Sequence, residues 1–160
     1  MRKIFFFITI CLIACHSRQG KEVALSTLPS FEMLLIDSAA ILKAQEIPTG
    51  QPIVLLFFRP DCTHCQAETQ VLLDHIDSLK NVRIYMLALE PLKEIKTFCL
   101  HYHLDQYKNF IVGRDYEYSF FRAFRPSTVP YMAIYDRNKR LVKIYNQEPG
   151  INNILNAIHI

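Results

Sequence analysis

The sequence lacks a hydrophobic run long enough to cross a membrane. A transmembrane helix needs about 20 consecutive apolar residues, whereas the apolar run near the N-terminus extends only from Ile4 to Ala14. It follows the basic pair Arg2-Lys3 and ends at Cys15, before a polar stretch. A basic start followed by a short apolar run predicts a secretion signal rather than a stable membrane anchor.

The sequence also lacks a large excess of charge of either sign. It has 18 basic and 15 acidic side chains, a formal net charge of +3, and loss of Arg2 and Lys3 with the signal leaves 16 basic side chains. Because the basic residues are scattered, no nucleic-acid partner is predicted. Hydrophobic residues make up 51% of the chain and aromatic residues 12%, as expected of a packed globule rather than a disordered tail.

The segment Leu12-Ile13-Ala14-Cys15 resembles the lipobox of bacterial lipoproteins, in which the signal is cut before a cysteine that then becomes lipidated. The resemblance implies a signal peptide at residues 1–14 and a lipidated Cys15. It also implies a periplasmic protein held to a membrane by its lipid. An ordinary signal peptide followed by an unrelated cysteine is the alternative.

Behind the lipid, the polar and aperiodic residues 15–30 are expected to form a flexible tether. Residues 31–160 are enough for one domain with a sizeable core. No internal repeat or low-complexity segment divides them. After processing, the cysteines left with free thiols are Cys62, Cys65 and Cys99, of which only the first two form a close pair.

Hydrophobic periodicity predicts an α/β domain with a central mixed sheet flanked by helices. Residues 41–47 fit a short strand or a helical turn, and residues 110–112 are too few to assign. Strands are expected at residues 31–37, 52–58, 82–89, 131–135 and 141–145. Helices are expected after the cysteine pair to about residue 81, and at residues 91–103, 116–124 and 151–158. The sequence thus predicts a βαβ unit, a helix, a hairpin and a final helix, which is the order of the thioredoxin fold.

The Cys62-Thr63-His64-Cys65 motif lies where a buried strand should end and a helix should begin. The free N–H groups of a helix start stabilise a thiolate, so Cys62 is the expected nucleophile. Cys65, one turn deeper, is within reach to resolve a mixed disulfide. Protonated His64 would stabilise the Cys62 thiolate, whereas the carboxylate of Asp61 would oppose it. The direction of the redox reaction therefore stays open.

The segment from Phe57 to Glu68 resembles the active-site segment of membrane-tethered thioredoxin-like proteins of the TlpA/ResA type. The resemblance covers about residues 31–160 and implies a Cys-x-x-Cys-x-x-Glu pattern, with Glu68 accepting or relaying the proton of Cys65. A Glu on the helix surface, favoured by the helix dipole, is the alternative. The family implies no cofactor. Its partners would be thiols or disulfides of exported proteins and a membrane redox partner.

The same resemblance implies a cis-proline that faces the redox pair, preceded by a residue whose backbone binds extended substrates. Val129-Pro130 fits best, because Pro130 directly precedes a predicted strand, and Pro126 is the weaker candidate. The chain departs from thioredoxins proper at two positions. It has Asp61 in place of a tryptophan and Leu56 in place of a buried aspartate, which argues against a role as a cytoplasmic thioredoxin.

Two other functions fit a Cys-x-x-Cys pair. One is a copper or zinc carrier, because Cys99, His101 and His103 form a second cluster of potential ligands and Cys99 and His103 would share a helix face. The other is a thioredoxin-like binding module with incidental thiols. An exported Cys-x-x-Cys at a strand-to-helix junction favours redox chemistry with no metal. Cys99 itself is interpreted as a small buried hydrophobe.

Overall fold

The computed structural model describes residues 25–36 and 40–159. It contains a seven-stranded mixed sheet with the strand order β2-β1-β5-β4-β3-β6-β7. The strands are β1 (Glu32–Leu35), β2 (Ile41–Lys43), β3 (Ile53–Phe57), β4 (Arg83–Ala88), β5 (Phe110–Arg114), β6 (Tyr131–Tyr135) and β7 (Leu141–Tyr145). Strands β3, β4 and β5 run parallel, and all other neighbours are antiparallel. The predicted α/β class with a mixed central sheet is confirmed.

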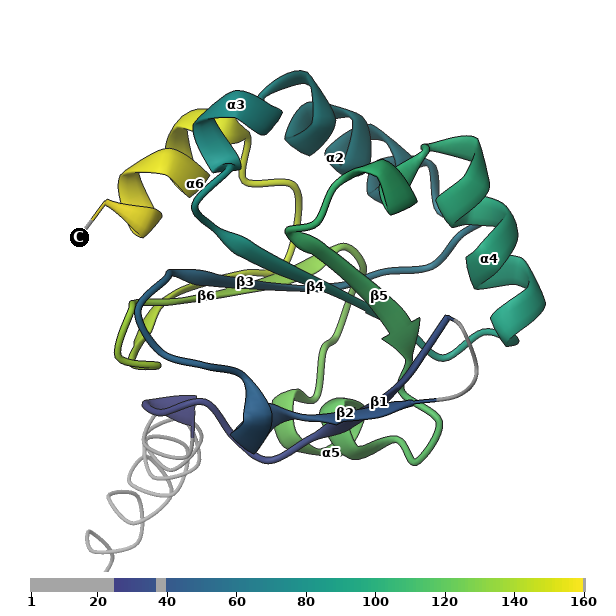
Figure 1. Cartoon of the computed structure of the whole chain (residues 1–160), viewed down its shortest axis with the longest axis horizontal. Coiled ribbons are helices and arrows are strands. Elements are labelled where there is room, and N and C mark those ends of the chain that lie inside the picture. Colours follow the sequence, from purple (N-terminus) through teal and green to yellow (C-terminus); the bar gives the residue numbers. More distant parts are fainter. Residues whose placement is uncertain (1–24, 37–39, 160) are drawn as a thin grey trace, which may run out of the picture.

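Helices cover both faces of this sheet (Figure 1). They are α2 (Thr63–Asp74), α3 (Ile76–Leu79), α4 (Leu92–His101), α5 (Ser119–Phe124) and α6 (Ile151–Ile158), with short 3-10 helices η1 (Ala44–Glu46) and η2 (Leu104–Gln106). Figure 1 shows α2, α3, α4 and α6 on one face, and α5 on the other. Each face has its own apolar core. Strand β3 separates the two cores, and its five residues are all buried.

The helix predicted to extend to about residue 81 ends earlier. Its first part, α2, stops at Asp74, and His75 leaves the helical conformation before α3 begins. The His75 Nδ1 atom contacts the Val71 carbonyl oxygen at 2.9 Å. That oxygen is the one the backbone N–H of His75 would bind in a continuous helix. The side chain thus takes the place of the helical hydrogen bond, and the prediction of one helix was wrong.

Helix α5 also differs from its predicted range, because it begins at Ser119 rather than at residue 116. The buried carboxylate of Asp115 accepts hydrogen bonds from the backbone N–H groups of Phe120 at 3.1 Å and Phe121 at 2.9 Å. These N–H groups have no partner within the helix, so the carboxylate caps it from outside. Because Asp115 caps the helix from four residues before Ser119, the chain between these two residues stays outside α5. The helix is therefore shorter than predicted.

The domain begins before residue 31. Leu25 is 1% exposed and belongs to the core beneath the sheet. Leu28 donates its N–H to the Lys139 carbonyl at 3.0 Å, and Thr27 forms a β-bridge with Arg140. The predicted tether of residues 15–30 is therefore too long at its C-terminal end. The predicted signal peptide at residues 1–14 and the lipidated Cys15 lie outside the described residues.

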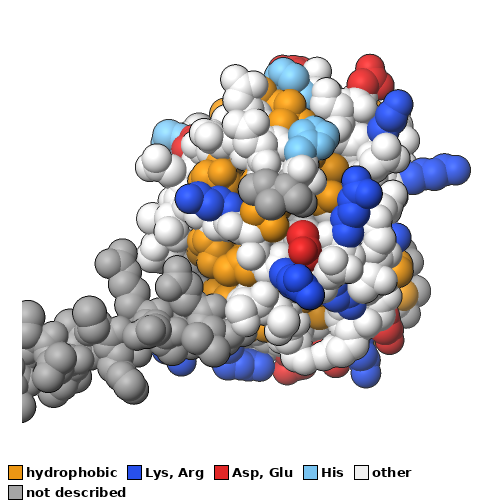
Figure 2. Space-filling model, turned by 90° about the vertical axis from the view of Figure 1, so that its left-hand side faces the viewer, with side chains coloured by type: hydrophobic (Ala, Val, Ile, Leu, Met, Phe, Trp, Pro, Cys, Tyr) orange, Lys and Arg blue, Asp and Glu red, His pale blue; other side chains and the backbone are white. Residues whose placement is uncertain are grey.

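No helix among the described residues is both long enough and apolar enough to span a membrane. Figure 2 shows one end of the molecule, where Lys and Arg side chains are dispersed among apolar and uncharged ones. The Cys62-Thr63-His64-Cys65 motif lies where β3 leads into α2.

Candidate active site

Cys62 is the N-cap residue of α2. Its backbone is extended, with φ −85° and ψ 115°, and its sulfur accepts a hydrogen bond from the Cys65 N–H at 3.4 Å. The chain reaches this position directly from β3, because a turn closed by the Cys62 N–H and the Arg59 carbonyl separates strand and helix. The sulfur therefore lies at the positive end of the helix dipole, where a thiolate is stabilised.

The two cysteines differ in their access to solvent. Cys62 is partly exposed, Cys65 is completely buried, and both are free thiols. Burial raises the pKa of the Cys65 thiol, and its hydrogen-bonded partner Cys62 raises it further. This asymmetry suits Cys62 to attack a substrate disulfide and Cys65 to act only once a mixed disulfide has formed.

Pro130 lies across from the cysteine pair, and its bond to Val129 is cis, as the resemblance implies. The Val129 carbonyl oxygen is 3.9 Å from the Cys62 sulfur. Strand β6 begins directly after Pro130 and pairs with β3, so the sheet brings this loop to the redox motif. A substrate role for Val129 and Pro130 remains a prediction.

Arg59 offsets the negative charge of Asp61. Its guanidinium binds Asp61 at 2.8 Å and Glu90 at 3.4 Å. The pKa of Arg59 is raised, first by the hydrogen bond and charge of Asp61 and also by the charges of Glu90 and Cys62. Arg59 thus places a positive charge between two carboxylates at the edge of the cysteine motif. The sequence interpretation assigned no role to Arg59.

His64 has a different partner from the one expected. Its ring is 71% exposed, and its Nδ1 atom forms an ion pair with Glu148 rather than supporting the Cys62 sulfur. Glu148 lies in the loop between β7 and α6. Sequence reasoning missed Glu148, since 84 residues separate the two side chains and no motif links them.

Glu68 is buried rather than on the helix surface. It is 1% exposed, and its Oε1 atom has no hydrogen-bond partner among the described residues. Burial, with a smaller contribution from the charge of Glu148, raises the pKa of Glu68 to about 7. The alternative of a surface Glu is therefore wrong. A carboxyl group one turn beyond Cys65 with a pKa near neutrality is suited to exchange its proton during catalysis.

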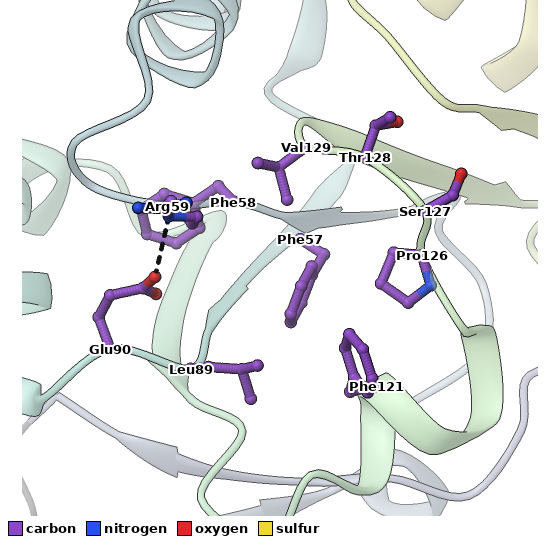
Figure 3. A pocket seen from close by; sticks show the side chains of 10 residues that line it. All are labelled: Phe57, Phe58, Arg59, Leu89, Glu90, Phe121, Pro126, Ser127, Thr128 and Val129. Carbon is purple, nitrogen blue, oxygen red and sulfur yellow. Dashed lines mark ion pairs between the residues drawn. The ribbon is translucent and has the colours of Figure 1, made fainter.

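A cavity of about 230 Å³ opens beside the redox motif (Figure 3). Figure 3 shows apolar side chains from three segments around it, and the Arg59–Glu90 ion pair at one side. Its apolar lining includes Phe57, Leu89, Phe121, Pro126 and Val129. Val129 is shared with the environment of the Cys62 sulfur, so the cavity and the nucleophile are neighbours.

The second cluster of potential metal ligands does not assemble. Helix α4 ends at His101, and His103 adopts a left-handed conformation with φ 52°. Cys99 is buried in the core, whereas both histidines are exposed, so the expectation that Cys99 and His103 share a helix face was wrong. Within residues 25–36 and 40–159, no three His, Cys, Asp or Glu side chains converge to hold a metal ion.

Cys99 is a core residue, as its sequence position suggested, and burial raises the pKa of its thiol to about 12. Cys99→Ala should leave the rate of disulfide exchange unchanged, because the thiol is neither ionised nor accessible. It should cost about 1 kcal/mol of stability through the small cavity left behind. Urea unfolding and an insulin-reduction assay test both expectations. A loss of exchange activity with folding intact would make Cys99 a third redox thiol.

The fold of this chain is similar to that of proteins of known structure. The sequence matches no protein-family model and no curated protein. By structure, the chain is similar to MTB DsbF, with a TM-score of 0.69 and 20% identity over 85% of this chain and 95% of that one. The chain has a thioredoxin-like fold.

Two further solved structures are also similar to the chain. A secreted Mycobacterium tuberculosis disulfide oxidoreductase homologous to E. coli DsbE has a TM-score of 0.66 and 18% identity, over 86% of this chain and 97% of that one. A putative protein disulfide isomerase from Bacteroides thetaiotaomicron has a TM-score of 0.65 and 17% identity, over 84% and 85% of the two chains. These likenesses establish the thioredoxin-like fold on which the redox motif is placed.

Proposed function

We propose that this protein is an extracytoplasmic, lipid-anchored thiol-disulfide oxidoreductase that acts on exported proteins through Cys62 and Cys65. The observation that carries the proposal is the placement of a partly exposed Cys62 sulfur at a helix N-terminus, 3.9 Å from the backbone of Val129. In the proposed arrangement, the nucleophile Cys62 lies beside the buried resolving thiol of Cys65 and beside Val129, whose backbone would bind an extended substrate. Two of the structural neighbours are named as a disulfide oxidoreductase and a putative protein disulfide isomerase, which are activities of the same class.

In this mechanism the Cys62 thiolate attacks a substrate disulfide and releases one substrate thiol. Cys65 then loses its proton to Glu68 and attacks the Cys62 sulfur, which releases the second substrate thiol and leaves an intramolecular disulfide. The reverse sequence oxidises substrate thiols. The cavity beside Val129 would hold an apolar side chain next to the substrate cysteine. A membrane redox partner would restore the starting state of the pair.

The proposal is tested by the reduction potential of the Cys62/Cys65 couple, measured by equilibration with glutathione and read by thiol alkylation. A value near about −270 mV suits a reductant supplied from the membrane, and one near about −120 mV suits a disulfide donor. A couple that never forms an intramolecular disulfide would overturn the proposal. Incorporation of labelled palmitate into the wild type, and its loss in a Cys15→Ser variant, tests the lipid anchor separately.

The metal-carrier alternative would need ligands besides the motif. Among the described residues, Cys99 is buried whereas His101 and His103 are exposed, and no three potential ligands converge to hold a metal ion. The binding-module alternative predicts that partner binding survives replacement of both motif cysteines by serine. The redox proposal predicts instead that covalent capture of substrates is lost in that double variant.

A further inference from the structure

The ion pair between His64 and Glu148 lies next to the buried carboxyl group of Glu68, whose Oε1 atom has no hydrogen-bond partner in the part of the chain that the structure describes. His64 and Glu68 are four residues apart on α2, so their side chains share one helix face. Glu148, which contacts His64, therefore lies on that face close to Glu68. Its charge acts on both buried groups of the site, because it contributes to the raised pKa of Glu68 and to that of Cys65.

The loop that carries Glu148 is held on both sides. Thr128, next to the cis-proline bond, donates its hydroxyl to the Asn146 carbonyl at 2.5 Å. On the other side, the Asn153 amide of α6 donates to the Pro149 carbonyl at 2.7 Å. One hydrogen bond on each side of Glu148 holds the backbone of the loop, and the contact with His64 places the Glu148 carboxylate beside α2. The ion pair with His64 is thus part of a supported arrangement.

We propose that Glu148 is a positioning residue that keeps a proton on the buried Glu68, and that protonated His64 weakens this effect by neutralising Glu148. The inference rests on the proposed redox function. A protonated Glu68 cannot accept the proton of Cys65, so the His64–Glu148 pair sets the pH at which the resolving step becomes fast. The ionisable side chains that α2 and its cap bring to this part of the site are Cys62, His64 and Cys65, and the β7–α6 loop adds Glu148.

The step affected is the second half of the exchange. The Cys65 thiol gives its proton to ionised Glu68 while its sulfur forms a bond with the Cys62 sulfur. The bond between Cys62 and the substrate sulfur breaks, and the substrate leaves as a thiolate that takes up a proton from water. The substrate disulfide has then gained two electrons, which the Cys62/Cys65 pair has lost. Removing the charge of Glu148 favours ionised Glu68, and removing the His64 cation disfavours it.

Ellman's reagent separates the two halves of the reaction in the full chain. Attack by Cys62 releases one 2-nitro-5-thiobenzoate, and the resolving attack by Cys65 releases a second. In Glu148→Gln, the pH midpoint of the second release should fall by about 0.5–1 pH unit. In His64→Gln it should rise. The double variant should behave like Glu148→Gln, because His64 acts only through Glu148. Glu117→Gln, which removes an exposed charge elsewhere, is the matched control and should leave the midpoint in place.

A direct measurement complements the kinetics. The carboxyl carbon resonance of Glu68 should titrate at lower pH in Glu148→Gln than in the wild type. The inference is overturned if the midpoint of the second release is unchanged in Glu148→Gln, or if both single variants shift it in the same direction. Failure of the proposed function has a different signature, namely a wild-type protein that gives no second release at any pH.

Discussion

The Cys62→Ser variant is expected to reduce or oxidise test disulfides no faster than buffer alone. Cys62 is the motif thiol with access to solvent, and its sulfur lies at the start of α2 beside Val129. Without it no mixed disulfide can form, because Cys65 is buried and its pKa is raised. Insulin reduction and oxidation of a reduced test protein measure the two directions.

The Cys65→Ser variant should fail at a later step. Cys62 still attacks the substrate disulfide, but no thiol is present to resolve the product, so a mixed disulfide accumulates. Non-reducing electrophoresis should show a covalent adduct of one protein and one substrate, which dithiothreitol releases. The Cys99→Ala variant is the matched control and should turn over normally. Full turnover by either motif variant would contradict the assignment of Cys62 as nucleophile and Cys65 as resolving thiol.

This asymmetry between the two cysteines could be predicted from sequence because it depends on local structure. The apolar run at residues 52–58 predicts a buried strand, and a polar break before the cysteines predicts the start of a helix. The N-cap position of Cys62 follows from these two elements alone. The family resemblance added the cis bond at Val129-Pro130, which no local pattern indicates.

Other features depend on tertiary contacts and could not be predicted in this way. Strand β5 was left unassigned because only three apolar residues precede Gly113. The structure explains the glycine, since a Cβ atom there would lie 2.6 Å from the Leu34 carbonyl oxygen of the neighbouring strand. The partner of His64 is equally non-local, because Glu148 reaches it only after β6, β7 and their loops have folded against α2. Neither contact can be predicted from the spacing of residues along the chain.

The burial of Glu68 also depends on tertiary contacts, and it affects the stability of the protein. Its position in the motif was evident, but whether it faced solvent or the protein interior depended on what packs against α2. The structure buries it with one oxygen unpaired, at a cost that the fold must offset elsewhere. A group retained under these conditions is better explained by its chemistry than by its contribution to stability.

Glu68→Gln is therefore expected to stabilise the reduced protein at alkaline pH while slowing the resolving step. The pKa of Glu68 is raised from 4.5 to about 7, so between these values the folded protein holds a proton that the unfolded chain has lost. The free energy of unfolding of the wild type should therefore decrease as pH rises across this range, and then level off. The total decrease attributable to Glu68 is about 3 kcal/mol.

Glutamine has no proton to lose, so the variant should escape this decrease. Urea unfolding under reducing conditions should give similar stabilities for variant and wild type at about pH 4, where Glu68 is neutral in both states, and a variant more stable by up to about 3 kcal/mol at about pH 8. Glu117→Gln removes an exposed charge of the same sign and should follow the wild type at both pH values. A stability difference between Glu68→Gln and the wild type that does not change with pH would show that the pKa of Glu68 is the same in the folded and unfolded protein, which would contradict the raised pKa of the buried carboxyl group.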